Sequence, residues 1–343
     1  MRAAVLHGPE DLRVETVPDP GLEGPADAIV RVTATAICGA DLFPYHGWVP
    51  GYEAGTIPGH EFAGVVAAVG SAVGRLRPGD RVVCTSMTSC GVCAHCREGR
   101  RTQCEARALF GYSGVSPRLD GGQAELVRVP GAERCLWRIP DGVSDEAAVF
   151  VGDILPTGYG AVVRGGAGVG DTVVVVGCGP VGLMALLAAR GVAGRLLAVD
   201  GIEARRALAA RLGAEAVAPD EAGEAVAAAT GGLGADVVIE AAGSQPALDT
   251  ALRLVRGRGT VSVVGAHFEP DYPLNNGLMF EREITLRFTI GDPGADRERL
   301  LGLIATGKLD PTEIVSHRLP LAEAPEAYRL FDGREATKVV LAP

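Results

Sequence analysis

The fold of this chain is decided by the stretch Val173-Val174-Val175-Val176-Gly177-Cys178-Gly179-Pro180-Val181-Gly182. Four consecutive valines predict a buried strand, and the apolar run that follows, from Leu183 to Arg190, predicts a helix. The three glycines between them have the spacing G-x-G-x-x-G, and a second predicted strand ends at Asp200. A lone glycine pattern is weak evidence, but one that joins a strand to a helix is typical of a dinucleotide-binding turn.

Each glycine of this turn has a separate task in such a site. Gly177 permits the sharp turn, Gly179 lets a pyrophosphate approach the backbone at the helix N-terminus, and Gly182 lets the helix pack closely on the strand. Asp200 can accept hydrogen bonds from ribose hydroxyls and repels a 2′-phosphate, so we expect NAD rather than NADP. The alternative interpretation is a glycine-rich connection without a ligand, and Asp200 argues against it.

Predicted strands and helices alternate from residue 154 onward. The strands are expected at residues 172–176, 195–199, 236–240 and 260–264. Alternation of this kind indicates α/β structure, a parallel sheet with helices on both faces in the doubly wound arrangement called a Rossmann fold. We assign residues 154–289 to this domain.

The remainder of the chain forms a second predicted domain. Before residue 154, short alternating runs are separated by turns such as Arg77-Pro78-Gly79-Asp80, which indicates a β-rich, barrel-like region. A predicted helix at 297–306 and a predicted strand at 337–341 follow the Rossmann domain and are expected to return to this region. Residues 1–153 and 290–343 therefore form one domain in our prediction. The ligand site is expected in the cleft between the two domains.

Length and charge limit the function classes that the chain can belong to. Its 343 residues suit two domains, and a net charge of -10 with a pI near 5.2 argues against nucleic acid and anionic membranes as partners. The most apolar window, Val173–Val192, contains glycines, a proline and an arginine, so it predicts a buried strand and helix rather than a membrane span. The N-terminus lacks the apolar core of a signal peptide, so we expect a cytoplasmic protein that acts on a small molecule.

Half of the eight cysteines lie in the segment 90–104. The first three cysteines are separated by two residues each, and the fourth follows after seven more. Four thiolates with this spacing can surround one tetrahedral zinc and leave no position open for a substrate, so the predicted zinc is structural. Unpaired loop cysteines and a redox dithiol are the alternatives, although isolated buried cysteines do not cluster at gaps of two residues. The expected ligands are Cys90, Cys93, Cys96 and Cys104.

Three further residues carry the side chains of an open zinc site. They are Cys38 in Ile37-Cys38-Gly39-Ala40-Asp41, His60 in Gly59-His60-Glu61, and Asp153 in Gly152-Asp153-Ile154. One thiolate, one imidazole and one carboxylate leave a fourth position for water or a substrate oxygen, which is the catalytic pattern. Sequence spacing alone does not unite them. Taken singly, Cys38 suits a core, His60 a hydrogen-bonded turn and Asp153 a helix cap.

The order of these motifs resembles that of one family over nearly the whole chain. Cys38-Gly39-Ala40-Asp41, Gly59-His60-Glu61, the cysteine segment 90–104 and the glycine turn occur as in zinc-dependent medium-chain alcohol dehydrogenases. The resemblance implies a GroES-like β-rich domain and two zinc ions per chain, with Cys38, His60 and Asp153 as ligands of the catalytic zinc. It also implies that Glu61 is the carboxylate beside that zinc and that Asp41 orients His60.

The same resemblance extends to the cofactor, the branch of the family and the assembly. Thr157 and Val181 match positions beside the nicotinamide, Arg205 matches one beside the ribose, and Lys338 matches one that reaches the pyrophosphate. The run Gly152-Asp153-Ile154-Leu155-Pro156-Thr157 resembles the branch of glutathione-independent formaldehyde dehydrogenases, in which Asp is the third zinc ligand. The family also implies a homodimer or homotetramer that pairs through the edges of its Rossmann sheets.

Two positions depart from the family pattern. Many members place Ser or Thr two residues after the first ligand cysteine, and often a His three residues further on, to carry a proton to solvent. This chain has Ala40 and Phe43 there, and neither side chain relays a proton. We expect His46 or a chain of water molecules to do so instead. The alternative interpretation of His46 is a surface histidine in a turn.

Three functions are compatible with these motifs. The first is a zinc-dependent alcohol dehydrogenase, an oxidoreductase that transfers hydride between an alcohol or aldehyde hydrate and NAD. The second is an NAD(P)H-dependent reductase of iminium groups or activated C=C bonds, which delivers no alkoxide proton. The third is a dinucleotide-binding protein without turnover that resembles crystallin-type relatives. The presence of all three open-site ligands and of Glu61 argues against the third function.

Overall fold

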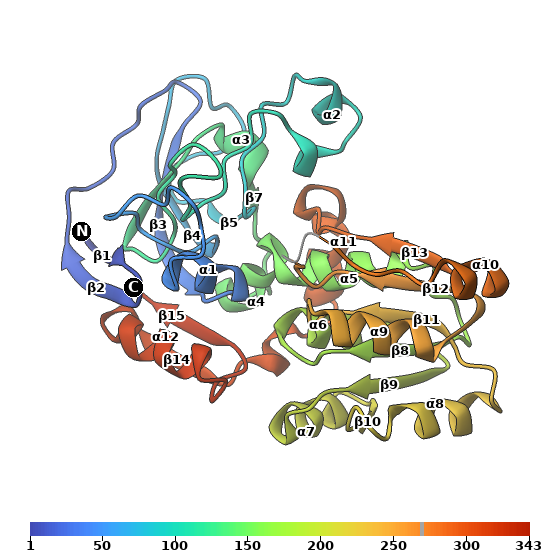
Figure 1. Ribbon diagram of the computed structural model, residues 1–343. Coiled ribbons are helices and arrows are strands. Elements are labelled where there is room, and N and C mark those ends of the chain that lie inside the picture. The colour runs from blue at the N-terminus through green and yellow to red at the C-terminus, as the bar shows by residue number, and fades with distance from the viewer. Residues whose placement is uncertain (268–270) are drawn as a thin grey trace. The chain divides into compact units, whose positions relative to one another are not determined.

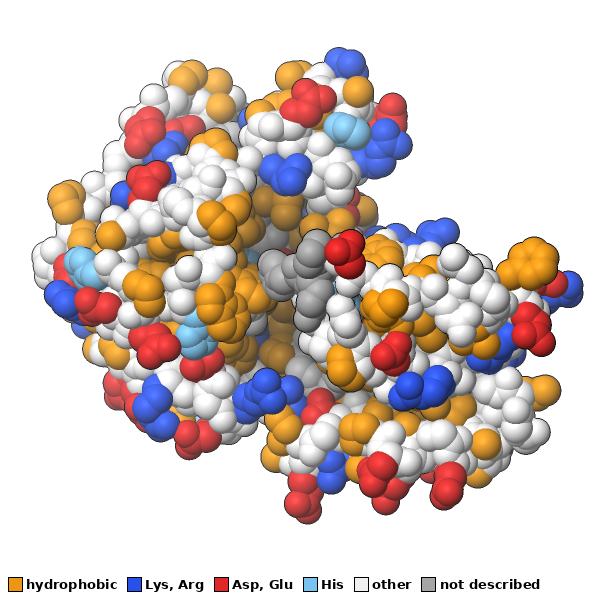
Figure 2. Space-filling model, in the orientation of Figure 1, with side chains coloured by type: hydrophobic (Ala, Val, Ile, Leu, Met, Phe, Trp, Pro, Cys, Tyr) orange, Lys and Arg blue, Asp and Glu red, His pale blue; other side chains and the backbone are white. Residues whose placement is uncertain are grey.

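Residues 1–267 and 271–343 are described by the computed structural model, which divides into two compact units (Figure 1). One unit contains Met1–Asp153 and Asp292–Pro343, and the other contains Ile154–Gly291. Each unit has a hydrophobic core of its own. Within the described ranges, no helix is both long and apolar enough to cross a membrane. On the face shown in Figure 2, acidic and basic side chains intermingle over the surface.

The second unit is the predicted doubly wound parallel sheet. Its strand order is β10-β9-β8-β11-β12-β13, and every neighbouring pair is parallel. The strands are β8 (Thr172–Val176), β9 (Arg195–Val199), β10 (Glu215–Val217), β11 (Ala235–Glu240), β12 (Val255–Val263) and β13 (Thr285–Phe288). The helices are α5 (Ile154–Arg164), α6 (Pro180–Ala189), α7 (Glu203–Arg211), α8 (Ala222–Thr230), α9 (Gln245–Leu254) and α10 (Asn276–Arg282). Because the chain order reverses between β8 and β11, the ligand-binding edge of such a sheet is expected at their carboxyl ends.

The valines of β8 explain why this run is apolar throughout rather than alternating. Val174 and Val176 pack into the core cluster shared with α8 and α9, whereas Val175 lies beside Gly182 in α6. Both faces of the strand are therefore buried. A Cβ on Gly182 would overlap the carbonyl oxygen of Gly177, and Gly177 itself has φ +94°. The turn thus requires glycine at both positions.

The first unit is built on a mainly antiparallel sheet that the end of the chain completes. The strand order is β14-β15-β3-β4-β5-β7, with β6 paired to β3, and β1 and β2 form a separate pair. The strands are β1 (Arg2–Gly8), β2 (Asp11–Thr16), β3 (Ala28–Ala36), β4 (Glu61–Val69), β5 (Arg81–Cys84), β6 (Leu126–Val129), β7 (Leu136–Arg138), β14 (His317–Pro320) and β15 (Val339–Ala342). The final strand β15 pairs with β3, so the segment after the Rossmann unit does return to the first unit.

Short helices occupy the connections of the first unit. The α-helices are α1 (Leu42–Tyr45), α2 (Ala94–Arg97), α3 (Ala132–Cys135), α4 (Asp145–Val149), α11 (Pro293–Ala305) and α12 (Ala324–Asp332). The 3-10 helices are η1 (Gly39–Asp41), η2 (Arg101–Gln103), η3 (Phe150–Gly152), η4 (Pro311–Ile314) and η5 (Leu321–Glu323). Helix α11 begins before the predicted 297–306, because Asp292 caps it and Pro293 suits its first turn. Helix α12 packs on the core that includes residues of β1.

Candidate functional site

The structure brings the three expected ligands of the open site together. The sulfur of Cys38, a ring nitrogen of His60 and a carboxylate oxygen of Asp153 lie within 4.8 Å of one another. Asp153 Oδ2 is 3.6 Å from Cys38 Sγ and 3.3 Å from His60 Nε2. Cys38 precedes η1, His60 precedes β4 and Asp153 follows η3, so the ends of three elements of the first unit present the ligands. We call these residues the triad.

The triad fits a divalent transition metal. Cys38 and His60 are buried, and only 22% of the Asp153 side chain is exposed, so the triad is largely enclosed. Burial raises the pKa of the Cys38 thiol, and a bound cation would oppose that effect because a coordinating thiol is deprotonated outright. A thiolate, a neutral imidazole and a carboxylate are ligand types that zinc takes, with a fourth position left for another ligand.

Asp41 contacts His60 at the ring nitrogen that faces away from Asp153. Its Oδ1 lies 3.0 Å from His60 Nδ1, and its Oδ2 accepts a hydrogen bond from the Cys38 backbone N–H at 3.0 Å. A carboxylate only accepts hydrogen bonds, so in the neutral ring Nδ1 carries the proton and Nε2 keeps its lone pair. The two atoms lie at ion-pair distance without the alignment of a hydrogen bond within the described residues, so proximity alone supports the expected orienting role of Asp41.

Glu61 follows His60 directly, and its side chain is buried with that of Lys338. The Lys338 ammonium donates to Glu61 Oε2 and, at 2.8 Å, to the carbonyl oxygen of Ile37. Burial alone would lower the pKa of Lys338, but the neighbouring acidic groups, Glu61 foremost, together outweigh burial and raise it. This contact gives a partner to a carboxylate that would be costly to bury unpaired, and the expected reach of Lys338 to a pyrophosphate stays a prediction. Within the described residues, Glu61 Oε1 is buried without a hydrogen-bond partner.

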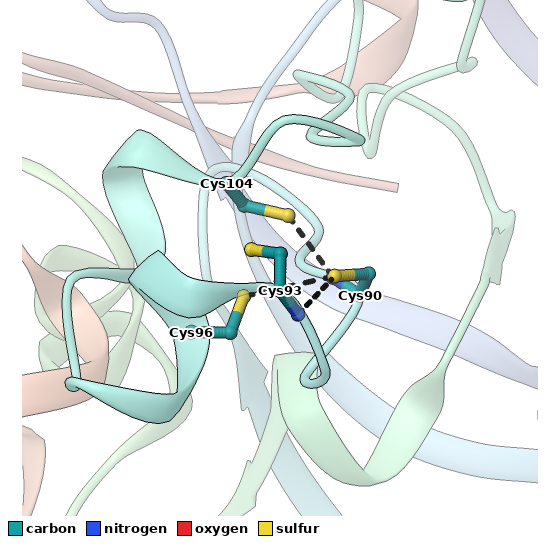
Figure 3. A group of neighbouring side chains, drawn as sticks. All are labelled: Cys90, Cys93, Cys96 and Cys104. Carbon is teal, nitrogen blue, oxygen red and sulfur yellow. Dashed lines mark hydrogen bonds between the residues drawn. The ribbon is translucent and has the colours of Figure 1, made fainter.

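The four cysteines of segment 90–104 form a second cluster in the first unit (Figure 3). Their sulfur atoms lie within 4.8 Å of one another, and the sulfurs of Cys90 and Cys96 are 3.9 Å apart. Cys90 Sγ accepts hydrogen bonds from the backbone N–H groups of Val92 and Cys93, which lower its pKa to about 6. All eight cysteines of the chain are free. The cluster suits a closed tetrahedral metal site rather than a pair of disulfides. Its members are Cys90, Cys93, Cys96 and Cys104.

The expected dinucleotide residues of the second unit surround the carboxyl end of β8. Asp200 Oδ2 accepts a hydrogen bond from the Cys178 backbone N–H at 2.7 Å, and Oδ1 accepts one from that of Ile202 at 2.8 Å. Arg205 Nη1 lies 4.0 Å from Asp200 Oδ2, so a cation adjoins this carboxylate. The remaining expected residues are Gly177 and Gly179 between β8 and α6, Val181 and Gly182 in the first turn of α6, and Thr157 in α5. Asp200 thus ties the end of β9 to the glycine turn.

His46 does not join the triad. Its Nε2 lies 2.9 Å from Asp332 Oδ1, its Nδ1 lies 3.3 Å from Glu10 Oε1, and its ring stacks on Trp48. Burial alone would lower the pKa of His46, but the hydrogen bonds to Asp332 and Glu10 outweigh burial and raise it. Both ring nitrogens are therefore engaged by carboxylates. His46 therefore pairs with two carboxylates in this structure, and its expected role in proton relay stays a prediction.

A further buried carboxylate, that of Glu240, belongs to none of the sequence motifs. It ends β11 and is fully buried. Its Oε1 accepts hydrogen bonds from the backbone N–H groups of Ala242 at 2.9 Å and Gly243 at 2.8 Å, and its Oε2 lies 2.9 Å from His267 Nε2. The position is beside the turn after β8, since Glu240 pairs with Val176. The sequence did contain a signal for this residue, because a glutamate stands at the end of a predicted buried strand.

Comparison with known proteins assigns the family. A family model described as the alcohol dehydrogenase GroES-like domain matches residues 24–141, and one described as zinc-binding dehydrogenase matches residues 180–306. Zinc-type alcohol dehydrogenase B of Aspergillus flavus is 37% identical over 99% of this chain and 81% of its own length. The two models and the fold define a zinc-binding dehydrogenase with a nucleotide-binding domain.

Solved structures agree with this class. The alcohol dehydrogenase TADH from Thermus sp. ATN1 matches with a TM-score of 0.96 and 41% identity, over 100% of this chain and 99% of its own. A protein of Sinorhizobium meliloti 1021 described as a zinc-binding dehydrogenase and bound to NADP matches with a TM-score of 0.87 and 30% identity, over 100% and 99% of the two chains. The chain belongs to the zinc-type medium-chain alcohol dehydrogenase family.

We predict that His46→Ala destabilises the protein more at pH 5.5 than at pH 8.5. A raised pKa means that the folded state holds the proton more tightly than the unfolded chain does. The stabilisation is therefore fully present below the ordinary value of 6.5 and is lost as the pH rises through the folded-state value. The expected loss at the lower pH is up to ~1 kcal/mol, measured by urea unfolding at both pH values.

His317→Ala is the matched control, because the His317 ring bonds the Ser316 hydroxyl rather than a carboxylate. It should show no such pH dependence. An equal loss of stability at both pH values for His46→Ala would contradict the ion-pairing role. So would unchanged stability accompanied by an altered pH profile of turnover, which would restore the relay hypothesis.

Proposed function

We propose that the chain is a zinc-dependent alcohol dehydrogenase that transfers hydride between an alcohol, or an aldehyde hydrate, and NAD. The observation that carries this proposal is the meeting of Cys38, His60 and Asp153 within 4.8 Å in the first unit. Zinc bound there would act as a Lewis acid that lowers the pKa of an alcohol or polarises a carbonyl. Alcohol dehydrogenase activity is also what the names of the similar proteins support.

The chain's own residues prepare this site in three ways. The triad supplies one thiolate, one imidazole and one carboxylate, so that a fourth position is left for the substrate oxygen. Asp41 holds the imidazole in the tautomer with a free Nε2. Lys338 balances the charge of Glu61 at full burial, and among the described residues Glu61 Oε1 has no hydrogen-bond partner.

Proton release separates this proposal from its nearest alternative. Ala40 and Phe43 carry no proton-relaying group, and His46 is held by Glu10 and Asp332. We infer that the alcohol proton leaves through water at the exposed side of Asp153. The missing relay side chains also favour a second candidate, reduction of iminium groups or activated C=C bonds by NAD(P)H. A panel of primary alcohols, iminium compounds and enones separates the two by which class is turned over.

The identity of the substrate, the branch of the family and the cellular location stay predictions. Formaldehyde is the substrate that the resemblance of the segment around Asp153 suggests, and the substrate partner is a small alcohol or aldehyde rather than a macromolecule. We also propose two zinc ions per chain, the second held by the four cysteines of segment 90–104. Residence in the cytoplasm is consistent with eight unpaired cysteines.

We predict that Asp153→Asn abolishes the more easily removed zinc and lowers kcat/KM by ~100-fold or more, beyond the loss typical of residues that only support a ligand. The substitution preserves shape and removes the ligand charge. NADH binding, followed by nicotinamide fluorescence, should not change. Asp141→Asn, at an exposed aspartate outside the triad, is the matched control. Retention of both zinc ions and of turnover in Asp153→Asn would refute the proposal.

The choice of NAD over NADP rests on Asp200, although one similar protein is bound to NADP. Asp200→Asn keeps an acceptor oxygen for the ribose and removes the charge that repels a 2′-phosphate. We predict that it raises the NADP-to-NAD ratio of kcat/KM by about tenfold, equivalent to ~1.4 kcal/mol. Adding Arg205→Ala should reverse the gain, because Arg205 adjoins the same carboxylate. A parent enzyme that prefers NADP, or an unchanged ratio in Asp200→Asn, would contradict the assignment.

We propose that the chain forms a homodimer or homotetramer through β13, one of the two edge strands of the parallel sheet. Phe288 on this strand is 65% exposed, and an uncovered apolar edge strand favours pairing with a second copy. Phe288→Arg should convert the protein to single chains in sedimentation velocity. Val169→Arg, at an exposed valine outside the sheet, should leave the assembly intact. A parent protein that sediments as one chain would exclude this assembly.

A further inference from the structure

Four buried side chains of the first unit form a line that ends at the metal ligand His60. The Tyr328 hydroxyl donates to Gln123 Oε1 at 3.0 Å, and Gln123 Nε2 donates to Asp41 Oδ2 at 3.4 Å. Asp41 Oδ1 in turn lies 3.0 Å from His60 Nδ1. The residues come from helix α12, from the loop before β6, from η1 and from the turn before β4. No more than 2% of any of them is exposed.

The chemistry of these groups fixes the direction of the line. The Asp41 carboxylate can only accept, so Gln123 must present its amide N–H to it. The Gln123 carbonyl then faces Tyr328, which must donate. Burial raises the pKa of Tyr328 well above its usual range, so its hydroxyl keeps the proton that it donates. Every link therefore points toward Asp41, and the other oxygen of Asp41 is left for His60 Nδ1.

Gln123 also supports the turn that carries His60. Its backbone N–H donates to the Pro58 carbonyl oxygen at 3.1 Å. Gly59, directly before His60, has φ +98°, and a Cβ there would collide with the Gln123 side chain. A glycine is thus required at Gly59 both by the backbone conformation and by the position of Gln123. One side chain contacts both the backbone before His60 and the carboxylate that orients its ring.

Two apolar side chains in place of Gln123 and Tyr328 would fill the same space at a lower cost in free energy. Buried amide and phenol groups lose hydration and stabilise little net unless their partners are well placed. Tyr328 lies in a core cluster whose other buried side chains are apolar. Its ring packs on that of Tyr45, with 5.1 Å between the ring centroids. Polar groups at such positions therefore call for a purpose other than packing.

We propose that Gln123 and Tyr328 are positioning residues of the metal site. They hold Asp41 so that His60 presents the lone pair of Nε2 to the ion, and neither touches substrate or cofactor. The inference rests on the proposed function only in requiring that the triad binds a divalent metal. It ties helix α12, close to the end of the chain, to the affinity of a site formed by Cys38, His60 and Asp153.

The test is the zinc affinity of the purified full chain, measured by competition with a chromophoric chelator. The affinity measured is that of the zinc ion at the triad, which Asp153→Asn is expected to remove. Gln123→Leu, which removes both hydrogen bonds, should weaken it by about tenfold, and Tyr328→Phe by about threefold, within or just below the range for residues that orient a ligand. Tyr52→Phe is the matched control, because the partly buried Tyr52 hydroxyl donates to the backbone carbonyl of Gly111 instead. It should leave the affinity unchanged.

A double-mutant cycle distinguishes positioning from general packing. If Gln123 acts through Asp41, then Gln123→Leu should cost no further affinity once Asp41→Asn is present. Additive losses would overturn the inference, as would unchanged affinity in both Gln123→Leu and Tyr328→Phe. Tyr328→Phe keeps the packing of the ring, so it remains informative if Gln123→Leu folds poorly. A parent protein with no second zinc equivalent would instead refute the proposed function, and the inference with it.

Discussion

Three ligating side chains, those of Cys38, His60 and Asp153, approach one another where little water reaches them. Such groups are costly to bury together unless they share a charge that satisfies all of them. A divalent cation does so, because it favours the thiolate and uses the lone pairs that would otherwise oppose each other. Much of the first unit is arranged around this constraint. The ends of η1 and η3 and the start of β4 supply the ligands, and the neighbouring buried carboxylates Asp41 and Glu61 each have a dedicated partner.

A similar constraint on buried polar groups applies to the second unit. Its parallel strands are apolar on both faces, so the polar groups that a ligand needs appear where the strands end. Asp200 and Glu240 both stand at such ends, and each uses its carboxylate to hold backbone N–H groups of the adjoining turn. The turns are thereby fixed before any ligand arrives. Preorganised backbone of this kind is what a pyrophosphate-binding turn requires.

The sequence allowed prediction of features whose signals are local. The valines of β8 with the glycine turn predicted a parallel α/β sheet, and the spacing of four cysteines predicted their cluster. The triad needed more, because its members lie far apart in the chain, and only the order of motifs seen in a known family joined them. Their meeting in space is a property of the folded sheet.

The partners of two expected site residues could not be foreseen in the same way. His46 was proposed from its place in the loop after Ala40 and Phe43, and Lys338 from a match to a family position, yet their partners Asp332 and Glu61 lie far away in sequence. An ion pair between residues far apart in sequence produces no periodic pattern from which it could be predicted. Gln123 likewise matches no motif, and its contact with Asp41 depends on how the loop before β6 folds over Gly59.

The most direct test of the account is an anomalous diffraction map of the purified protein recorded at the zinc absorption edge. We expect two peaks per chain, one among the four cysteines of segment 90–104 and one bounded by Cys38, His60 and Asp153. A single peak at the four cysteines, with the other three side chains bonded only to one another, would contradict it.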